Sequence, residues 1–267
     1  MYSEITYWQV ALASGLIVVS GAISILLRLR MEKSLLIASL RTVVQLVLVG
    51  FVLQWVFHLD RWYVVVGLGC LMTFVAGLTA AHRNQRRYPG IWFNTILSIW
   101  ASSWSVTAFA LLAVLQGIDH WYQPQYAIPL LGMVLGNTLN GISVGLNTYT
   151  EALVAHRDRV ESLLALGATR WEASRSTAQH AIRTGMTPII NSMMVVGIVS
   201  LPGMMTGQLI SGMAPLQAVK YQIVIMFLIA SATALGTVGV VMLSFLRLFN
   251  SDHQFLSRSI SSKRTNG

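Results

Sequence analysis

Residues 221–246 read YQIVIMFLIASATALGTVGVVMLSFL, a run of 26 residues without a charged side chain. A helix needs about 20 apolar residues to cross a bilayer, so this run predicts a transmembrane helix. The chain contains seven such runs, and only the second holds a charge, Arg41 near one end. The expected spans are residues 7–27, 35–57, 62–81, 91–115, 126–146, 186–210 and 221–246.

The composition indicates a membrane protein. The 267 residues are 55% hydrophobic and only 10% charged, whereas soluble domains carry about 25% charged residues. The first run follows Glu4 without a basic residue and is longer than a signal-peptide core, so we expect it to be retained. The sequence therefore predicts an all-α, polytopic transmembrane helical bundle of about seven spans, forming a single domain over residues 1–267.

The basic residues predict the topology. They gather in segments 28–34, 82–90 and 147–185 and in the tail after residue 246, whereas the opposite loops hold only Arg61 and Lys220. Because cytoplasmic loops are the basic ones, the N-terminus is expected outside and the C-terminus in the cytoplasm. The net charge of +9 then reflects topology and contact with membrane lipid, and no nucleic acid is expected as a partner.

The longest polar segment, about residues 147–185, contains ESLLALGATR at 161–170. Its apolar residues fall on one face at helical spacing. Gly167 suits the position after a helix end, where φ is positive. Thr169 and Glu172 match a capping box, so a second helix is expected to begin at once. The pattern predicts a helix–turn–helix at the cytoplasmic face.

Two interpretations of this unit remain open. It is either an amphipathic loop that lies in the membrane interface or a docking element that passes movement from a soluble partner into the spans. A turn with both helix ends capped is rigid, which favours the second interpretation.

Three stretches carry a resemblance to a known family: ALGAT at 165–169, GIVSLPGMMTGQLISG at 197–212 and APLQAVKYQ at 214–222. In this order they resemble the FetB-type family of ABC-transporter permeases, which is associated with iron export and related to plant aluminium-tolerance permeases. ESLLALGAT is similar to the coupling motif of ABC permeases, a Glu with a Gly six positions on, at Glu161 and Gly167. The resemblance covers most of the chain.

The resemblance implies a single permease domain of a transporter, in the bacterial inner membrane, that exports iron or another metal. The chain has no G-x-x-x-x-G-K-[ST] phosphate loop, so ATP is expected on a separate cytoplasmic ATP-binding subunit. The chain itself would be no enzyme, with no catalytic residue and no cofactor of its own, and the family plan implies a homodimer. The residues expected to couple to the ATPase are Glu161, Leu164, Gly167, Thr169 and Glu172.

The fifth run contains polar and small residues of interest. Two G-x-x-x-G pairs permit close helix approach, and two asparagines three residues apart share a face. Amides in lipid are costly unless they face protein or water, so the asparagines either bond to neighbouring helices or line a pathway. The residues are Gly132 with Gly136, Gly141 with Gly145, and Asn137 with Asn140.

The sixth run is the least regular. Pro202 removes a backbone donor and Gly203 follows it, so a kink or break is expected here. In membranes such a break is tolerated where protein or water satisfies the freed carbonyls, so the pathway is a candidate to use it. Nearby methionines either pack or contact cargo, although thioethers prefer soft metals and ferric iron prefers oxygen. These neighbours are Asn191, Met193, Met194, Met204 and Met205.

No resident metal site is expected, because the histidines lie in loops or at span ends and no H-E-x-x-H or C-x-x-C spacing occurs. Arg41 and Gln45 lie at i and i+4 in the second span. Arg41 either extends to the membrane interface or takes part in a pathway.

A second class of function remains open: an ATP-independent secondary carrier or an intramembrane enzyme. An ion-coupled carrier would be expected to hold an Asp or Glu within its spans, and these spans have none. Paired catalytic residues of an intramembrane protease are likewise not seen. Both observations favour the permease.

Overall fold

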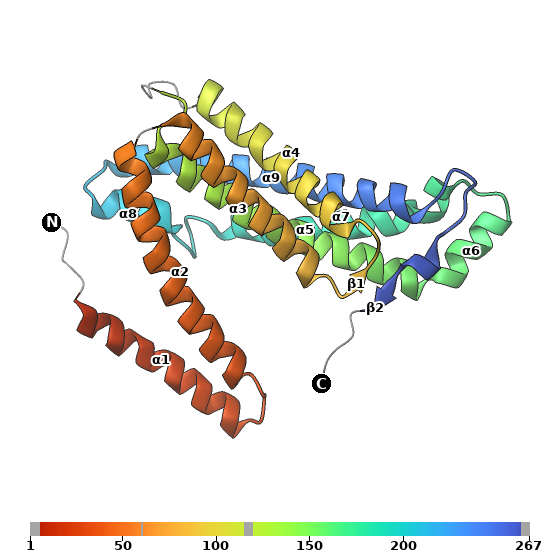
Figure 1. Ribbon diagram of the computed structural model, residues 1–267, viewed down its shortest axis with the longest axis horizontal. Helices are drawn as coiled ribbons and strands as arrows, with labels where there is room; N and C mark the ends of the chain where they lie inside the picture. Colours follow the sequence, from red (N-terminus) through yellow and green to blue (C-terminus); the bar gives the residue numbers. More distant parts are fainter. Residues whose placement is uncertain (1–5, 60, 115–119, 263–267) are drawn as a thin grey trace.

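The computed structural model describes residues 6–59, 61–114 and 120–262, which form a helical bundle with a separate helical hairpin (Figure 1). Three parts of the sequence predictions lie outside the described residues: Glu4, the last residue of the fourth expected span, and the tail beyond 262. The helices are α1 Tyr7–Leu26, α2 Glu32–Leu59, α3 Trp62–Arg83, α4 Ile91–Phe109 with the π-helical turn η1 Ala110–Val114, α5 Pro124–Ala155, α6 Arg157–Ala165, α7 Arg170–Val195, α8 Gly203–Ile210 and α9 Pro215–Leu248.

Six helices in the described part of the chain are long and apolar enough to cross a membrane: α1, α2, α3, α4 with η1, α5 and α9. This confirms the predicted all-α polytopic fold. These six helices match six of the seven expected runs. Helices α5 and α9, with 32 and 34 residues, extend beyond the predicted ends. At about 1.5 Å per residue each is longer than a bilayer is thick.

The remaining expected span, residues 186–210, is not one helix. Its first part belongs to α7, which begins much earlier at Arg170 and runs through Pro188 to Val195. Its second part is the short helix α8. The predicted start of the sixth span at residue 186 is therefore wrong, because the helix begins at Arg170. Residues 170–185 are too polar to look like part of a span, yet they continue the same helix.

Helix α5 is the centre of the bundle and packs against α3, α4, α7 and α9. Its seam with α7 and α9 is made of very small residues. A Cβ built on Gly185 of α7 would lie 2.8 Å from the carbonyl oxygen of Gly141 and 2.7 Å from Cγ2 of Thr237. In lipid, helices gain no hydrophobic energy from leaving one apolar phase for another, so close packing of this kind holds them together.

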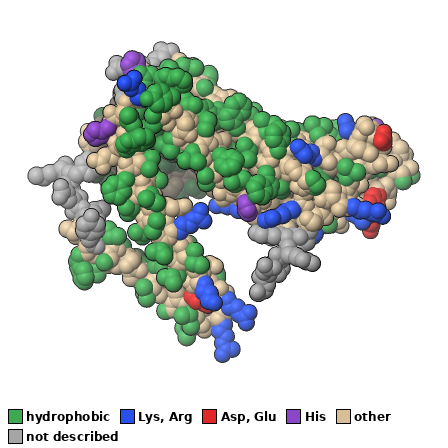
Figure 2. Space-filling model, viewed as in Figure 1, with side chains coloured by type: hydrophobic (Ala, Val, Ile, Leu, Met, Phe, Trp, Pro, Cys, Tyr) green, Lys and Arg blue, Asp and Glu red, His purple; other side chains and the backbone are tan. Residues whose placement is uncertain are grey.

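The α1–α2 hairpin stands away from this bundle (Figure 1). It is tied at its turn by Ser24, whose hydroxyl donates to Glu32 at 3.2 Å and accepts from the N–H of Met31 at 3.0 Å. Most large side chains of both helices are exposed. Figure 2 shows hydrophobic side chains over the visible surface of the hairpin, with Lys and Arg side chains at the turn that joins α1 and α2.

The first prediction concerns the glycine seam. Gly185→Ala places a methyl group against backbone, so α7 must shift, and overpacking of this kind costs about 1–3 kcal/mol. Thermal unfolding in detergent is expected to occur at a lower Tm than in the wild type. The control is Gly67→Ala on α3, where nothing lies within 4 Å of the new Cβ. Equal Tm values for both variants would contradict the role of the seam.

Candidate functional site

The turn between α6 and α7 is closed at both ends. Helix α6 ends in a Schellman arrangement, in which the N–H of Ala168 donates to the carbonyl of Leu163 at 3.0 Å and that of Gly167 to Leu164 at 3.1 Å. Gly167 has φ +91°, as its predicted position requires. Nothing lies within 4 Å of a Cβ built there, so backbone conformation alone selects glycine.

Helix α7 begins with the predicted capping box. The hydroxyl of Thr169 accepts from the N–H of Glu172 at 3.3 Å, and the Glu172 carboxylate accepts from the N–H of Thr169 at 2.8 Å and from its hydroxyl at 2.7 Å. The hydrogen bond from the backbone N–H of Thr169 has the largest effect and the bond from its hydroxyl the next largest, and together they hold the pKa of Glu172 below its usual value. The box is therefore complete above the ordinary carboxyl pKa and opens only as pH falls through the lowered value.

The apolar side of this unit is packed and its tip is bare. Val160 is buried, and Leu163 and Leu164 pack partly buried against the main core, as the predicted stripe requires. Glu161 instead pairs on the surface with Arg157 at 2.6 Å. Leu166, at the turn itself, is 85% exposed. The helix–turn–helix therefore presents one apolar side chain on a rigid turn.

The chain after α9 holds this turn from behind, which the sequence did not predict. The N–H of Arg170 donates to Nδ1 of His253 at 3.0 Å, and its guanidinium donates to the carbonyl of Asn250 at 3.1 Å. Phe255 stacks on the buried Phe249 with ring centroids 5.1 Å apart. Strand β2, Ser261–Ser262, then pairs antiparallel with β1, Arg86–Arg87, in the α3–α4 connection.

At the other end of α7 the helix stops and the chain turns twice. Val196 has extended backbone (ψ 135°) and Gly197 has φ +83°. Pro202 then caps the start of α8. The predicted break is present but wider than expected, because it covers residues 196–202. Pro202→Ala would therefore not restore a continuous helix, since Gly197 already ends it.

A cavity of about 320 Å³ lies at this break, between α5, α7, α8 and α9. It contains polar groups, among them Asn137, Ser192, Ser200 and Gln222, together with Pro202 and several methionines. Gln222 also lines an adjoining cavity of about 320 Å³. Its side-chain carbonyl oxygen is buried and, among the described residues, accepts no hydrogen bond. Such an oxygen is costly to bury unless a water or a ligand reaches it.

The structure brings together only some of the predicted pathway residues. Asn137, Pro202 and Met204 line the polar cavity, and Met193 and Met205 line its neighbour. Asn140 instead accepts from the guanidinium of Arg83 at 2.8 Å. Asn191 and Met194 are exposed on α7 and line neither cavity. Sequence reasoning missed further lining residues on α5 and α9, among them Met133, Gln222 and Met226. Gln222 ends the stretch 214–222, but nothing in that stretch indicates that it lines a cavity.

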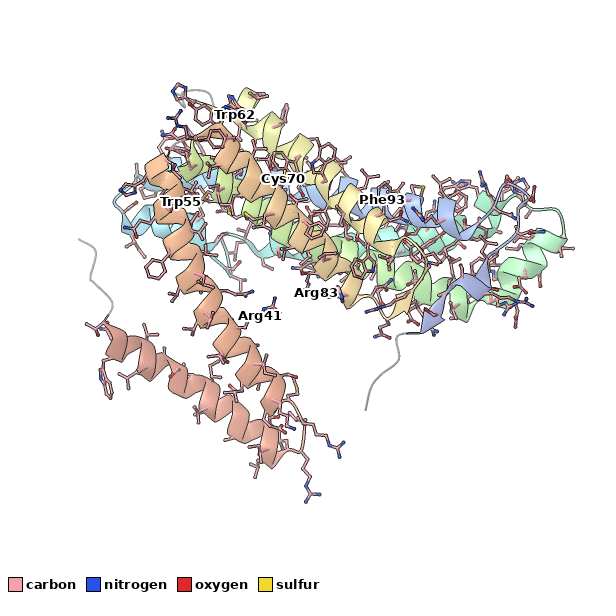
Figure 3. The ribbon with its side chains drawn as sticks, viewed as in Figure 1. Arg41, Trp55, Trp62, Cys70, Arg83 and Phe93 are labelled. Carbon is pink, nitrogen blue, oxygen red and sulfur yellow. The ribbon has the colours of Figure 1, made fainter. Side chains whose placement is uncertain are left out.

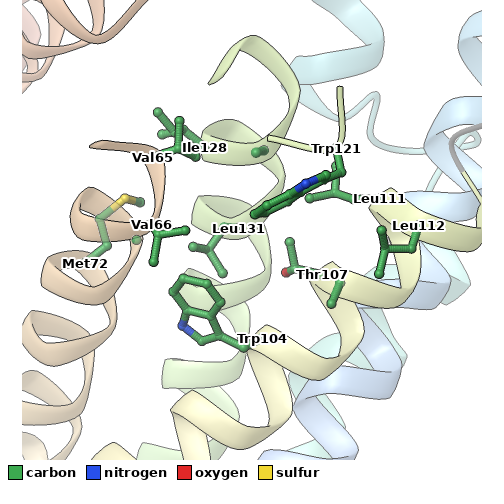
Figure 4. Close-up of a pocket in the computed structure, with 13 residues that line it drawn as sticks. Val65, Val66, Met72, Trp104, Thr107, Leu111, Leu112, Trp121, Ile128 and Leu131 are labelled. Carbon is green, nitrogen blue, oxygen red and sulfur yellow. The ribbon is translucent and has the colours of Figure 1, made fainter. Parts of the chain in front are cut away.

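Another cavity differs in chemistry. It has about 230 Å³ and lies between α3, α4 with η1, and α5, where Figure 4 shows Trp104, Trp121 and Leu131 around it. Its walls are almost wholly apolar, which does not suit an ion. Within residues 6–59, 61–114 and 120–262, no group of three or more His, Cys, Asp or Glu side chains is placed to hold a metal.

Residues 7–249 match the model of the Uncharacterised protein family (UPF0014). The chain belongs to this family. It is 40% identical over 229 residues to a UPF0014 membrane protein of Synechocystis (85% of this chain, 88% of the relative). It is 32% identical over 260 residues to the Probable iron export permease protein FetB of Escherichia coli (97% and 98%). It is 30% identical over 266 residues to Protein ALUMINUM SENSITIVE 3 of Arabidopsis thaliana (96% and 95%). No solved structure matches it significantly.

The family match confirms the resemblance seen in the sequence and, with the apolar helices, makes the chain an integral membrane protein. The match covers both the capped turn and the α7–α8 break. The two features lie at opposite ends of one helix, α7.

The second prediction concerns the capped turn. Thr169→Ala removes the cap at a typical cost of about 1 kcal/mol, so amides in the first turn of α7 are expected to exchange about fivefold faster. Hydrogen exchange with mass spectrometry of peptides covering 166–175 measures this. Thr184→Ala is the control, because that hydroxyl bonds only to His180 of its own helix. Unchanged exchange in Thr169→Ala would contradict the cap.

Proposed function

We propose that this chain is the permease subunit of an ATP-binding-cassette transporter that exports a metal ion, driven by a separate cytoplasmic ATPase. The proposal includes a homodimer of permeases in a bacterial inner membrane, with the N-terminus outside and the C-terminus in the cytoplasm. The E. coli relative, the Probable iron export permease protein FetB, supports the cargo class. The alternation of basic loops supports the orientation.

The observation that carries the proposal is the rigid turn with its exposed Leu166. A conformational change of a soluble partner is transmitted to the helical bundle only through rigid contacts. The turn is closed by the Schellman bonds and the capping box, and the chain after α9 supports it from behind. An apolar side chain 85% exposed on such a turn suits a pocket on a partner protein.

The polar cavity at the α7–α8 break supports a pathway. Helix α7 runs without interruption from the capped turn to this cavity, so a tilt of its cytoplasmic end moves the cavity wall. Irregular backbone at membrane depth is tolerated where it lines a cavity. The amide and hydroxyl oxygens of Asn137, Gln222 and Ser192 replace part of a cation's hydration shell, and weak neutral ligands release cargo readily.

The third prediction tests the ATPase contact. Leu166→Glu places a charge on the proposed contact without disturbing the core, because the side chain is bare. We expect the tagged variant to insert normally but to capture at least tenfold less of the co-expressed ATP-binding-cassette subunit. Gln179→Glu adds the same charge at another exposed position on α7. Equal capture by Leu166→Glu and wild type would reject the turn as the docking element.

The fourth prediction tests the pathway. Gln222→Leu keeps the volume of the side chain but removes the unpaired oxygen, so export is expected to fall at least severalfold while expression and ATPase capture persist. Iron retained by cells that co-express the ATPase measures export. Gln217→Leu is the control, because Gln217 is exposed near the start of α9. Full export by Gln222→Leu would exclude the cavity as the route.

A further inference from the structure

An open groove lies between the α1–α2 hairpin and the bundle. It has a volume of about 690 Å³, and its walls come from α2, α3 and α5. The wall residues are apolar or small with a single hydroxyl, that of Thr79, and they include the Gly132 and Gly136 pair. Nothing lies within 4 Å of a Cβ built on Gly136, and one built on Gly132 would meet only the methyl carbon of Met72 at 3.3 Å, so this G-x-x-x-G pair packs against no other backbone.

Each of the three walls ends in a polar residue at the same end of the groove. On α2, Leu48 and Val52 line the groove, and Arg41 lies seven residues before Leu48, on the same helix face. On α3, Arg83 lies seven residues after the wall residue Ala76, again on the same face. Helices α2 and α3 run antiparallel, so the start of α2 and the end of α3 point to the same side of the molecule (Figure 1).

The third wall joins the same polar end. Asn140 follows the wall residue Gly136 by four positions on α5 and accepts from Arg83 at 2.8 Å. Figure 3 shows Arg41 extending from α2 into the opening, with Arg83 on the side of the bundle. The groove itself is lined by apolar and small residues, and the two arginines lie on its wall helices beyond the residues that line it.

Arg41 has no counter-charge in the described part of the chain, where it makes no hydrogen bond or ion pair. The acids of the three wall helices are Glu32 and Glu151, at helix ends. Glu32 accepts from Ser24 and Glu151 pairs with Arg86. A second copy of the chain would also bring no acid to this depth, so it could fill the groove without neutralising Arg41.

The depth of Arg41 suits a phosphate at the membrane surface. It lies nine residues after the first residue of α2, which is about 13 Å along the helix axis. The headgroup layer takes up about 6 Å of that distance. A long arginine side chain directed toward the helix N-terminus covers much of the remainder.

We propose that an anionic phospholipid occupies this groove, with an acyl chain along α2, α3 and α5 and its phosphate at Arg41 and Arg83. The apolar walls take the chain, and the two guanidinium groups take the phosphate oxygens. Lipid held here fills the space that separates the hairpin from the bundle. The site is distinct from the cavity at the α7–α8 break and does not depend on the transport proposal.

The headgroup test uses the full chain in nanodiscs of mixed phosphatidylglycerol and phosphatidylcholine, released into native mass spectrometry. Wild type is expected to retain one phosphatidylglycerol per chain in preference to phosphatidylcholine. Arg41→Gln is expected to weaken retention roughly fivefold, as for the loss of one basic residue near a membrane surface. Arg61→Gln is the control, because it removes the same charge at the opposite end of α3. Equal retention by Arg41→Gln and wild type would overturn the proposal.

The acyl-chain test uses Gly136→Leu, which places a side chain in the groove at a position where a Cβ has no protein atom within 4 Å, and Gly67→Leu as the control on α3 outside it. Only Gly136→Leu is expected to lose the bound lipid, while both variants keep the wild-type Tm. The variant Leu48→Cys in a Cys70→Ala background tests the alternative that a second copy of the chain occupies the groove. If two chains cross-link through it in nanodiscs, a second copy fills the groove and the lipid proposal is wrong.

Discussion

The contact of Gly185 with Gly141 and Gly145 fixes the rest of the bundle. Because none of these residues has a side chain, the α5 and α7 backbones approach until the carbonyl oxygen of Gly141 lies 2.8 Å from where a Cβ of Gly185 would be. Thr237 of α9 fills the remaining space. This contact holds the middle of α7, a helix whose ends carry the capped turn and the polar cavity. Without it, neither end would have a defined position relative to α5.

A helix that is held at its middle can act as a lever. Helix α7 has 26 residues, about 39 Å at 1.5 Å per residue. Its first turn is fixed to α6 and to the chain after α9, so these parts move with it. Its far end stops at Val195, and two irregular turns separate it from α8. In the proposed transporter, the cytoplasmic end of α7 receives the movement of the ATPase, and the other end of the helix transmits it to the cavity wall.

The sequence predicted what depends on local physics. Hydropathy located the apolar helices, and the capping chemistry of Thr169, Glu172 and Gly167 located the turn to the residue. It failed where a distant partner decides. A helix was expected to begin after Thr169, but its continuation through residues 170–185 into the sixth expected span was not, because their packing against α5 is not visible in their composition. The pairing of Ser261–Ser262 with Arg86–Arg87 spans most of the chain and leaves no local signal. Gln222 was not singled out, because the cavity that it lines is formed by residues of α5, α7 and α8 that are distant in the sequence.

The two G-x-x-x-G pairs of α5 show why the hairpin and the bundle differ. Both pairs have the same spacing, yet Gly141 and Gly145 meet another backbone and Gly132 and Gly136 meet almost none. Within a bilayer, lipid chains solvate an apolar helix as well as another helix does, so only close contact holds two helices together. The α1–α2 hairpin has little such contact with the bundle. The proposed lipid in the groove would therefore add contact between the hairpin and the bundle, and the unpaired Arg41 favours an occupant with a negative charge.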